Sequence, residues 1–261
     1  MQPRKLSLLA LIGVFVFIAA CGGGGGDGGG GGGGDGGGGG PQSTSAVDPA
    51  TAATISGKVL FTGTPASPAP IAMTDEQTCQ DKYPDGAFTE AELVNADGTL
   101  PNVFVYVKTG LESLTFPVPT TSVVLDQEGC RYHPHVFGIQ AGQELIIRNS
   151  DGILHNIHPM PTVNRAFNLG QPVAMDSKKT FDKAEVMIPI ECDVHDWMKG
   201  YLGVLAHPYF ATTGSDGAFS LPNLPPGTYT IEAWTELYDT QTMDVTVAAS
   251  ETKAIEFSFG N

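Results

Sequence analysis

The sequence predicts an all-β protein of the sandwich type, and three observations lead to that prediction. Short apolar segments recur from residue 54 to the end of the chain. Strong turn signals separate them, such as Asp-Gly at 97–98 and 216–217 and Pro-Pro-Gly at 225–227. No stretch keeps a period of about 3.6 residues long enough for a major helix, although 74–82 could form a short one. The candidate strands include residues 55–61, 103–107, 144–148, 186–190, 201–205, 229–234 and 255–259.

Residues 1–20 predict an export signal. Arg4 and Lys5 precede an apolar run that is shorter than the roughly 20 residues of a membrane-spanning helix. The Ile-Ala-Ala-Cys sequence at 18–21 resembles the bacterial lipobox, in which the cysteine is acylated and becomes the new N-terminus. The resemblance implies a lipid anchor on Cys21; ordinary secretion with an incidental Cys21 is the alternative.

A flexible tether is expected over residues 21–53. Residues 22–40 are seventeen glycines and two aspartates, which offer no side chains for a core. We therefore expect a protein lipid-anchored in the bacterial cell envelope, at the outer membrane or in the periplasm or at the surface, with its folded part held away from the membrane.

The charge balance excludes one class of partner. The chain has 13 Lys and Arg against 28 Asp and Glu, a formal net charge of −15. Nucleic acid binding requires basic side chains against phosphates, so no nucleic acid partner is expected. The sequence also lacks a recognisable nucleophile triad, phosphate-binding loop or paired-carboxylate motif, which argues against an enzyme.

The strongest chemical signal is the sequence Cys-Asp-Val-His-Asp-Trp-Met at 192–198. It puts a thiolate, an imidazole and a thioether on one short loop, and His155 upstream offers a second imidazole. Two His and one Cys with a weak axial Met are the ligands of blue copper electron-transfer sites. Zinc could use some of these donors, but zinc sites rarely include a thioether.

Residues 122–208 resemble a cupredoxin of the plastocyanin and amicyanin group. The resemblance covers Asn149-x-Asp151 before His155-Asn156, an apolar strand ending at Cys192, and Gly-Tyr-Leu-Gly-Val at 200–204; the ligand-loop spacing is that of amicyanins. It implies a Greek-key sandwich that holds one mononuclear type 1 copper ion. The implied ligands are His155, Cys192, His195 and axial Met198, with Asn156 hydrogen-bonding the ligand loop across the site. Asp196 stands where amicyanins have proline. The alternative is a cupredoxin fold that has lost its metal or binds another.

Residues 209–260 resemble the carboxypeptidase regulatory-like, or transthyretin-type, sandwich. The matching features are the Asp-Gly-x-Phe turn at 216–219 and the Pro-Pro-Gly-x-Tyr turn at 225–229. The opening strands of that module stand far upstream, so we expect 54–121 plus 209–261 to form one sandwich, with the cupredoxin of 122–208 inserted into it. Two domains in series, 54–121 and 122–260, are the alternative.

The cysteines suggest a disulfide. In an oxidising compartment spare thiols tend to pair. With Cys21 carrying lipid and Cys192 carrying metal, Cys79 and Cys130 remain for each other. The alternative is a second metal site around Cys130, His133 and His135.

Two side chains near the ligands have less specific expectations. His158 is expected at the surface or behind a ligand. Trp197 is expected to pack around the metal, with electron entry as the alternative.

These features together predict a membrane-tethered electron carrier, with electrons passing through the exposed edge of His195. Its partner would be a redox protein such as a c-type cytochrome or a dehydrogenase, attracted by Asp151, Asp193 and Asp196 if the partner is basic. The alternatives are a structural or adhesive surface lipoprotein whose cupredoxin domain is vestigial, and a copper sequestration or delivery protein.

Overall fold

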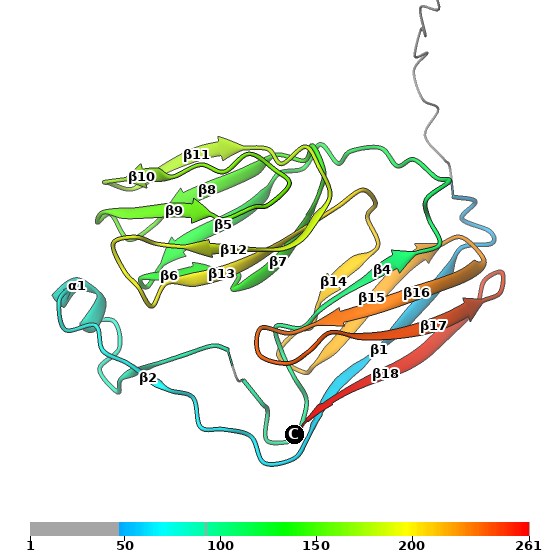
Figure 1. Cartoon of the computed structure of the whole chain (residues 1–261), viewed down its shortest axis with the longest axis horizontal. Coiled ribbons are helices and arrows are strands. Elements are labelled where there is room, and N and C mark those ends of the chain that lie inside the picture. Colours follow the sequence, from blue (N-terminus) through cyan, green and yellow to red (C-terminus); the bar gives the residue numbers. More distant parts are fainter. Residues whose placement is uncertain (1–46, 92, 261) are drawn as a thin grey trace, which may run out of the picture. The chain divides into compact units, whose positions relative to one another are not determined.

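The computed structural model describes residues 47–91 and 93–260, and their fold is almost entirely β (Figure 1). The predicted signal peptide, Cys21 and most of the glycine-rich tether lie outside the described residues. The expected short helix is present as α1 (Gln77–Gln80), whose N-cap Glu76 accepts a hydrogen bond from the backbone N–H of Thr78. Within the described residues, no helix has the length and apolar character that a membrane span requires. The all-β prediction is confirmed.

Two facing sheets contain strands from both ends of the described chain. One sheet has the order β15-β1-β18 and the other β14-β4-β16-β17. Their bounds are β1 (Ala53–Thr62), β15 (Ala218–Leu224), β18 (Thr252–Gly260), β14 (Phe210–Thr212), β4 (Phe104–Thr109), β16 (Gly227–Trp234) and β17 (Gln241–Val247). We call this pair the scaffold sandwich. Its core is apolar and includes Ile55, Val105, Leu221, Ile231 and Phe257.

Strand β1 is the central strand of its sheet, although it opens the described fold. It pairs in parallel with β18, from Thr54 opposite Thr252 to Thr62 opposite Gly260, and antiparallel with β15 (Figure 1, blue beside red). Strand β4 likewise lies between β14 and β16. Hydrogen bonding therefore joins strands that precede residue 122 to strands that follow residue 209. Whether this sandwich folds without the intervening residues stays a prediction.

The intervening residues form a second sandwich, which we call the ligand sandwich. One sheet has the order β10-β9-β12-β13-β7 and the other β11-β8-β5-β6. The bounds are β5 (Val123–Glu128), β6 (Arg131–His133), β7 (Val136–Gln140), β8 (Leu145–Asn149), β9 (His155–Pro159), β10 (Leu169–Gln171), β11 (Met175–Lys179), β12 (Glu185–Glu191) and β13 (Lys199–Leu205). Strands β5 and β8 pair in parallel, as do β7 and β13, and the core includes Leu125, Ile147, Ile188 and Leu202.

Residues 70–91, between β1 and β4, contain α1 and the short strands β2 (Pro70–Ile71) and β3 (Ala87–Phe88). We call them the disulfide segment, because Cys79 is bonded to Cys130 of the ligand sandwich. A small apolar cluster surrounds this bond and includes Met73, Ala87 and, partly buried, Trp197. The disulfide segment is thus fixed against the end of the ligand sandwich that carries the 192–198 loop.

Two glycines allow the sandwiches to pack closely. Gly138 of β7 and Gly203 of β13 are register partners. A Cβ at Gly203 would lie 2.5 Å from the ring of Phe104, and one at Gly138 would lie 2.6 Å from the ring of Phe210. Phe104 is fully buried in a cluster that joins β4 to β7 and β13. Because these two glycines have no side chains, the aromatic rings of the scaffold sandwich can pack directly against β7 and β13.

Candidate metal centre

The four predicted ligands come from two chain segments at one end of the ligand sandwich. His155 is the first residue of β9, and Cys192 directly follows β12. His195 and Met198 lie on the loop that leads into β13. Backbone hydrogen bonds close this loop: Cys192 N–H donates to the Met198 carbonyl at 3.2 Å, and Met198 N–H donates to the His195 carbonyl at 3.0 Å. The short spacing in the sequence thus becomes a tight turn.

Three of the four side chains bring donor atoms together. The two Nδ1 atoms of His155 and His195 are 3.0 Å apart, and Cys192 Sγ is 3.7 Å from Nδ1 of His195. The donor atoms of these three residues all lie within 4.8 Å of one another, close enough for one ion to contact all three. Met198 is 1% exposed and packs in the same core cluster as Cys192.

The protonation states favour a metal ligand at Cys192. Burial alone would raise the pKa of its thiol, but hydrogen bonds from His155 and His195 lower that pKa to about 6. The thiol is therefore largely ionised at neutral pH, and the thiolate is the form that binds metals. Burial would lower the pKa of His155, but Asp151 and Cys192 raise it.

Asn156 connects the two ligand-bearing segments. Its Oδ1 accepts a 2.6 Å hydrogen bond from the backbone N–H of Asp193, and its Nδ2 donates to Asp193 Oδ2 at 3.1 Å and to Asn168 at 2.7 Å. Because Asp193 follows Cys192, these bonds fix the start of the ligand loop. His158 lies on the other face of β9, where its Nδ1 is 3.0 Å from Asp193 Oδ1, so it is not brought to the donor cluster.

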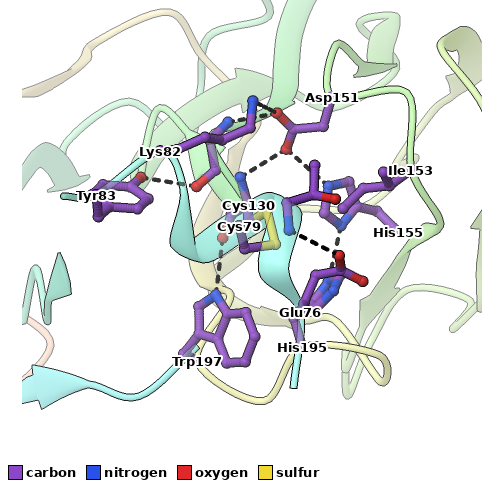
Figure 2. The surroundings of a disulfide bond; sticks show 12 residues. Glu76, Cys79, Lys82, Tyr83, Cys130, Asp151, Ile153, His155, His195 and Trp197 are labelled. Atoms are coloured by element: carbon purple, nitrogen blue, oxygen red, sulfur yellow. Dashed lines mark hydrogen bonds and ion pairs between the residues drawn. A yellow bond between two sulfur atoms is a disulfide. The ribbon is translucent and has the colours of Figure 1, made fainter. Parts of the chain in front are cut away.

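Asp151 does not meet the condition for attracting a partner, which was that its side chain face that partner. Its side chain is completely buried, and Oδ2 lies 2.9 Å from Nε2 of His155 (Figure 2). Burial alone would raise the pKa of this carboxyl, but hydrogen bonds from His155, Lys82 and the backbone hold it well below its usual range. Asp151 therefore supports a ligand and cannot face a partner. Asp193 and Asp196 are exposed, as expected of partner-facing acids.

The expected exposed edge of His195 is wrong, since His195 is only 3% exposed. The ring of Trp197 lies 5.0 Å from it, and Trp197 Nε1 donates to the Cys130 carbonyl at 3.1 Å (Figure 2). Trp197 also packs against the apolar cluster of the disulfide segment and lines a cavity of about 200 Å³. The expected packing of Trp197 near the candidate ligands is thus observed, whereas its contacts with Cys130 and the disulfide segment were not expected from the sequence.

The other candidate site is not assembled. Cys130 is in the disulfide, so its sulfur is not a free thiolate even though it lies near Asp151 and His155. His133 is exposed. His135 binds Glu236 of the scaffold sandwich at 2.8 Å and the Lys199 carbonyl at 3.1 Å. These contacts assign His135 to the junction between the sandwiches.

The donor set fits copper. Thiolate, imidazole and thioether are soft or borderline donors, and the trigonal His₂Cys set with a weak axial Met is the donor set of blue-copper electron-transfer sites. His155 also has the hydrogen-bonded carboxylate that usually orients a metal-binding imidazole. The described residues thus contain a buried group of ligands suited to one copper ion.

Comparison with known proteins gives one family match and several structural resemblances. Residues 204–260 match the model of the carboxypeptidase regulatory-like domain. None of the curated proteins matches the chain. The copper-containing nitrite reductase of Thermus scotoductus SA-01 is 19% identical with a TM-score of 0.32, over 40% of this chain and 25% of that one. This chain therefore spans about a quarter of the reductase.

Amicyanin structures give similar values. An oxidised proline-to-alanine variant of amicyanin is 23% identical with a TM-score of 0.28, over 32% of this chain and 81% of that one. The Cu(I) form of a methionine-to-alanine variant is 20% identical with a TM-score of 0.28, over 38% of this chain and 97% of that one.

Proposed function

We propose that the protein is a blue copper electron carrier, tethered by a lipid anchor in the bacterial cell envelope. The observation that carries this proposal is the convergence of His155, Cys192 and His195 within 4.8 Å, with buried Met198 on the same loop. A copper ion held there would accept one electron as Cu(II) and release it as Cu(I). The partner supplying or receiving that electron would be a redox protein such as a c-type cytochrome or a dehydrogenase.

Hydrogen bonds would hold the candidate ligands in the same positions in both oxidation states of the copper ion. Asn156 and the backbone bonds of the 192–198 loop hold Cys192, while Asp151 holds His155. A ligand set that is held in one arrangement changes little when the ion gains or loses an electron. Burial of all four ligands also favours a retained ion over one that is handed to another protein, so it supports a carrier over copper delivery.

The test is the absorption spectrum of the purified protein after addition of Cu(II). We expect an intense blue band from charge transfer between the Cys192 thiolate and the metal. Cys192→Ser should abolish the band, because it removes both the chromophore and a main bond. Met198→Gln should keep the copper and change its reduction potential, since the axial bond is weak. Met160→Gln, at an exposed methionine outside the loop, is the matched control and should change neither.

Three other outcomes would contradict the proposal. A colourless protein with weak copper affinity would favour a structural or adhesive role for the sandwiches. A tight but colourless Cu(I) complex that exchanges readily would favour sequestration or delivery. A blue band that survives loss of Cys192 would refute the assignment of the site.

The membrane part of the proposal is tested separately. The lipobox-like sequence at 18–21 supports acylation of Cys21. In a bacterial host, the full chain should take up labelled palmitate and sediment with membranes, whereas Cys21→Ser should do neither. A chain that stays in the soluble fraction with Cys21 intact would contradict the lipid anchor.

A further inference from the structure

Asp151 is a buried carboxylate with four partners from three parts of the chain. Its Oδ1 accepts from Lys82 Nζ at 2.7 Å and from the backbone N–H of Gly129 at 2.8 Å. Its Oδ2 accepts from the backbone N–H of Cys130 at 2.7 Å and lies 2.9 Å from His155 Nε2. Figure 2 shows the carboxylate between the disulfide, Lys82 and the His155 ring. The side chain of Asp151 thus connects Lys82 of the disulfide segment to the predicted metal ligand His155.

The contact with His155 fixes which ring nitrogen is free. An ionised carboxylate can only accept hydrogen bonds, so Nε2 of His155 must carry the proton that lies between them. The other nitrogen, Nδ1, faces Nδ1 of His195 at 3.0 Å and is the atom available to a metal. Hydrogen bonding to a carboxylate also makes an imidazole a stronger electron donor to its metal.

Lys82 acts on the same carboxylate from the opposite side. Its side chain is 36% exposed, while the Asp151 side chain is fully buried, so the ion pair is only partly screened by solvent. The positive charge draws electron density on Asp151 away from His155. Lys82 belongs to the disulfide segment, which is held to the ligand sandwich by the Cys79–Cys130 bond. Removing Lys82 and removing the Asp151 charge should therefore act on His155 in opposite directions.

We propose that Lys82 and Asp151 are positioning residues that tune the metal centre through His155, with Asp151 favouring Cu(II) and Lys82 favouring Cu(I). The inference rests on the proposed copper function and adds the disulfide segment to the metal centre. The contacts could instead serve only to hold the Gly129–Cys130 turn in place. That structural role predicts no opposite effects on the reduction potential.

The test compares four forms of the full chain with the wild type. Asp151→Asn keeps an acceptor for His155 Nε2 but loses the charge, and Lys82→Gln removes the charge of the lysine. The third form carries both changes. Tyr83→Phe is the matched control, because the Tyr83 hydroxyl donates to the Gly129 carbonyl at 2.8 Å and so holds the same turn without touching Asp151. The reduction potential of each copper-loaded form is measured by spectroelectrochemistry.

We expect Asp151→Asn to raise the potential by about 59 mV, a tenfold shift in the relative affinity for Cu(II) and Cu(I). Lys82→Gln should lower the potential by a smaller amount, because its charge is farther from the metal and partly exposed. The Lys82→Gln effect should shrink in the Asp151→Asn background, since Asp151 carries it. Tyr83→Phe should leave the potential unchanged. Shifts of one sign in all forms, or an undiminished Lys82 effect in the double variant, would overturn the proposal.

A second measurement needs no copper. Ring ¹⁵N shifts of His155 in the metal-free protein, at a pH where the ring is neutral, should show the proton on Nε2. A proton on Nδ1 in the wild type would overturn the positioning role even if the copper potentials behave as expected. A wild type that gives no blue band refutes the proposed function alone, and the ring shifts then still decide whether Asp151 orients His155. The experiments therefore distinguish failure of the proposed copper function from failure of the positioning role of Asp151.

Discussion

The two sandwiches differ in what they bury. The scaffold sandwich has an apolar core built from Ile55, Val105, Ile231 and similar side chains. The ligand sandwich also has an apolar core, but one end of it buries His155, Asn156, Cys192 and His195 together. Polar groups are costly to bury unless their hydrogen bonds are satisfied. These four side chains have hydrogen-bond partners among themselves and in Asp151 and Asp193, so the buried polar groups at this end form one local network.

A second buried polar network in the ligand sandwich lies directly behind the ligands. Gln171 donates to the Ile147 carbonyl at 3.1 Å, and Asn149 donates to the carbonyls of Ile153 at 2.7 Å and Gln171 at 2.9 Å. Asn149 Oδ1 also accepts from the backbone N–H of Asp151 at 3.1 Å. These bonds shape the turn that delivers His155. The scaffold sandwich also buries polar side chains, among them Thr213 and Glu232, but the groups of possible metal ligands found in the described residues lie in the ligand sandwich.

The largest change to the chain that we consider is the deletion of the ligand sandwich from the scaffold sandwich. A chain in which residues 122–208 are replaced by a short linker should still fold, because β1 and β4 keep their partners β15, β16 and β18. Its thermal unfolding, followed by circular dichroism, should be a single cooperative transition. If this chain stays unfolded while 53–121 folds alone, the inserted arrangement of the domains is wrong and a serial one replaces it.

The next effect concerns the link between the disulfide segment and the ligand sandwich. The Cys79–Cys130 bond closes a loop with a sequence separation of 51 residues. On the chain-entropy model, the double variant Cys79→Ser and Cys130→Ser should lose about 4 kcal/mol of unfolding free energy. Urea titration of both forms measures this loss. Peptide mapping without reductant that finds either thiol free in the wild type would contradict the bond itself.

A smaller effect tests the junction between the sandwiches. Gly203→Ala would bring a methyl group against the ring of Phe104, and such overpacking costs about 1–3 kcal/mol. We expect a lower melting temperature with an unchanged copper band, because the ligands are at the end near the disulfide segment. Gly170→Ala is the matched control, since a Cβ there meets nothing within 4 Å. A changed band would show that the scaffold sandwich constrains the metal centre.

The last prediction concerns the pH dependence of copper binding, which is expected to be small near neutral pH and to grow as the pH falls. The pKa of Cys192 is depressed to about 6, so the thiolate is present above that pH and is lost as the pH falls through it. Affinity for Cu(II) should therefore fall by at least tenfold per pH unit below about 6, as a proton competes for the sulfur. Copper titrations between pH 5 and 8 check this. A decline that already begins near the ordinary thiol pKa of about 8.5 would contradict it.

Local patterns predicted the β fold, and they pointed to the side chains of His155, Cys192 and His195 that the structure brings together, because the causes lie within short stretches. Alternating apolar residues and Asp-Gly turns determine strands, and the 192–198 spacing puts its side chains on one loop. The burial of Asp151 was not predicted, since an acid beside Gly152 in a turn is usually solvated. Its burial depends on Lys82, 69 residues away, and on the backbone of Gly129 and Cys130. Trp197 was expected beside the site, but the burial of His195 was not, because Trp197 is held by Cys130 and by the disulfide segment, which are distant in the chain.

The pairing of β1 with β18 has a consequence for the order in which the protein can form. About 190 residues separate Thr62 from Thr252, and synthesis proceeds at roughly 5–20 residues per second. Strand β1 therefore exists for on the order of 10–40 s before its parallel neighbour is made. During that time its apolar residues Ile55, Val59 and Phe61 have no completed core to enter. Strands β5 to β13 are synthesised before β18, so the ligand sandwich can assemble before β1 has its parallel partner.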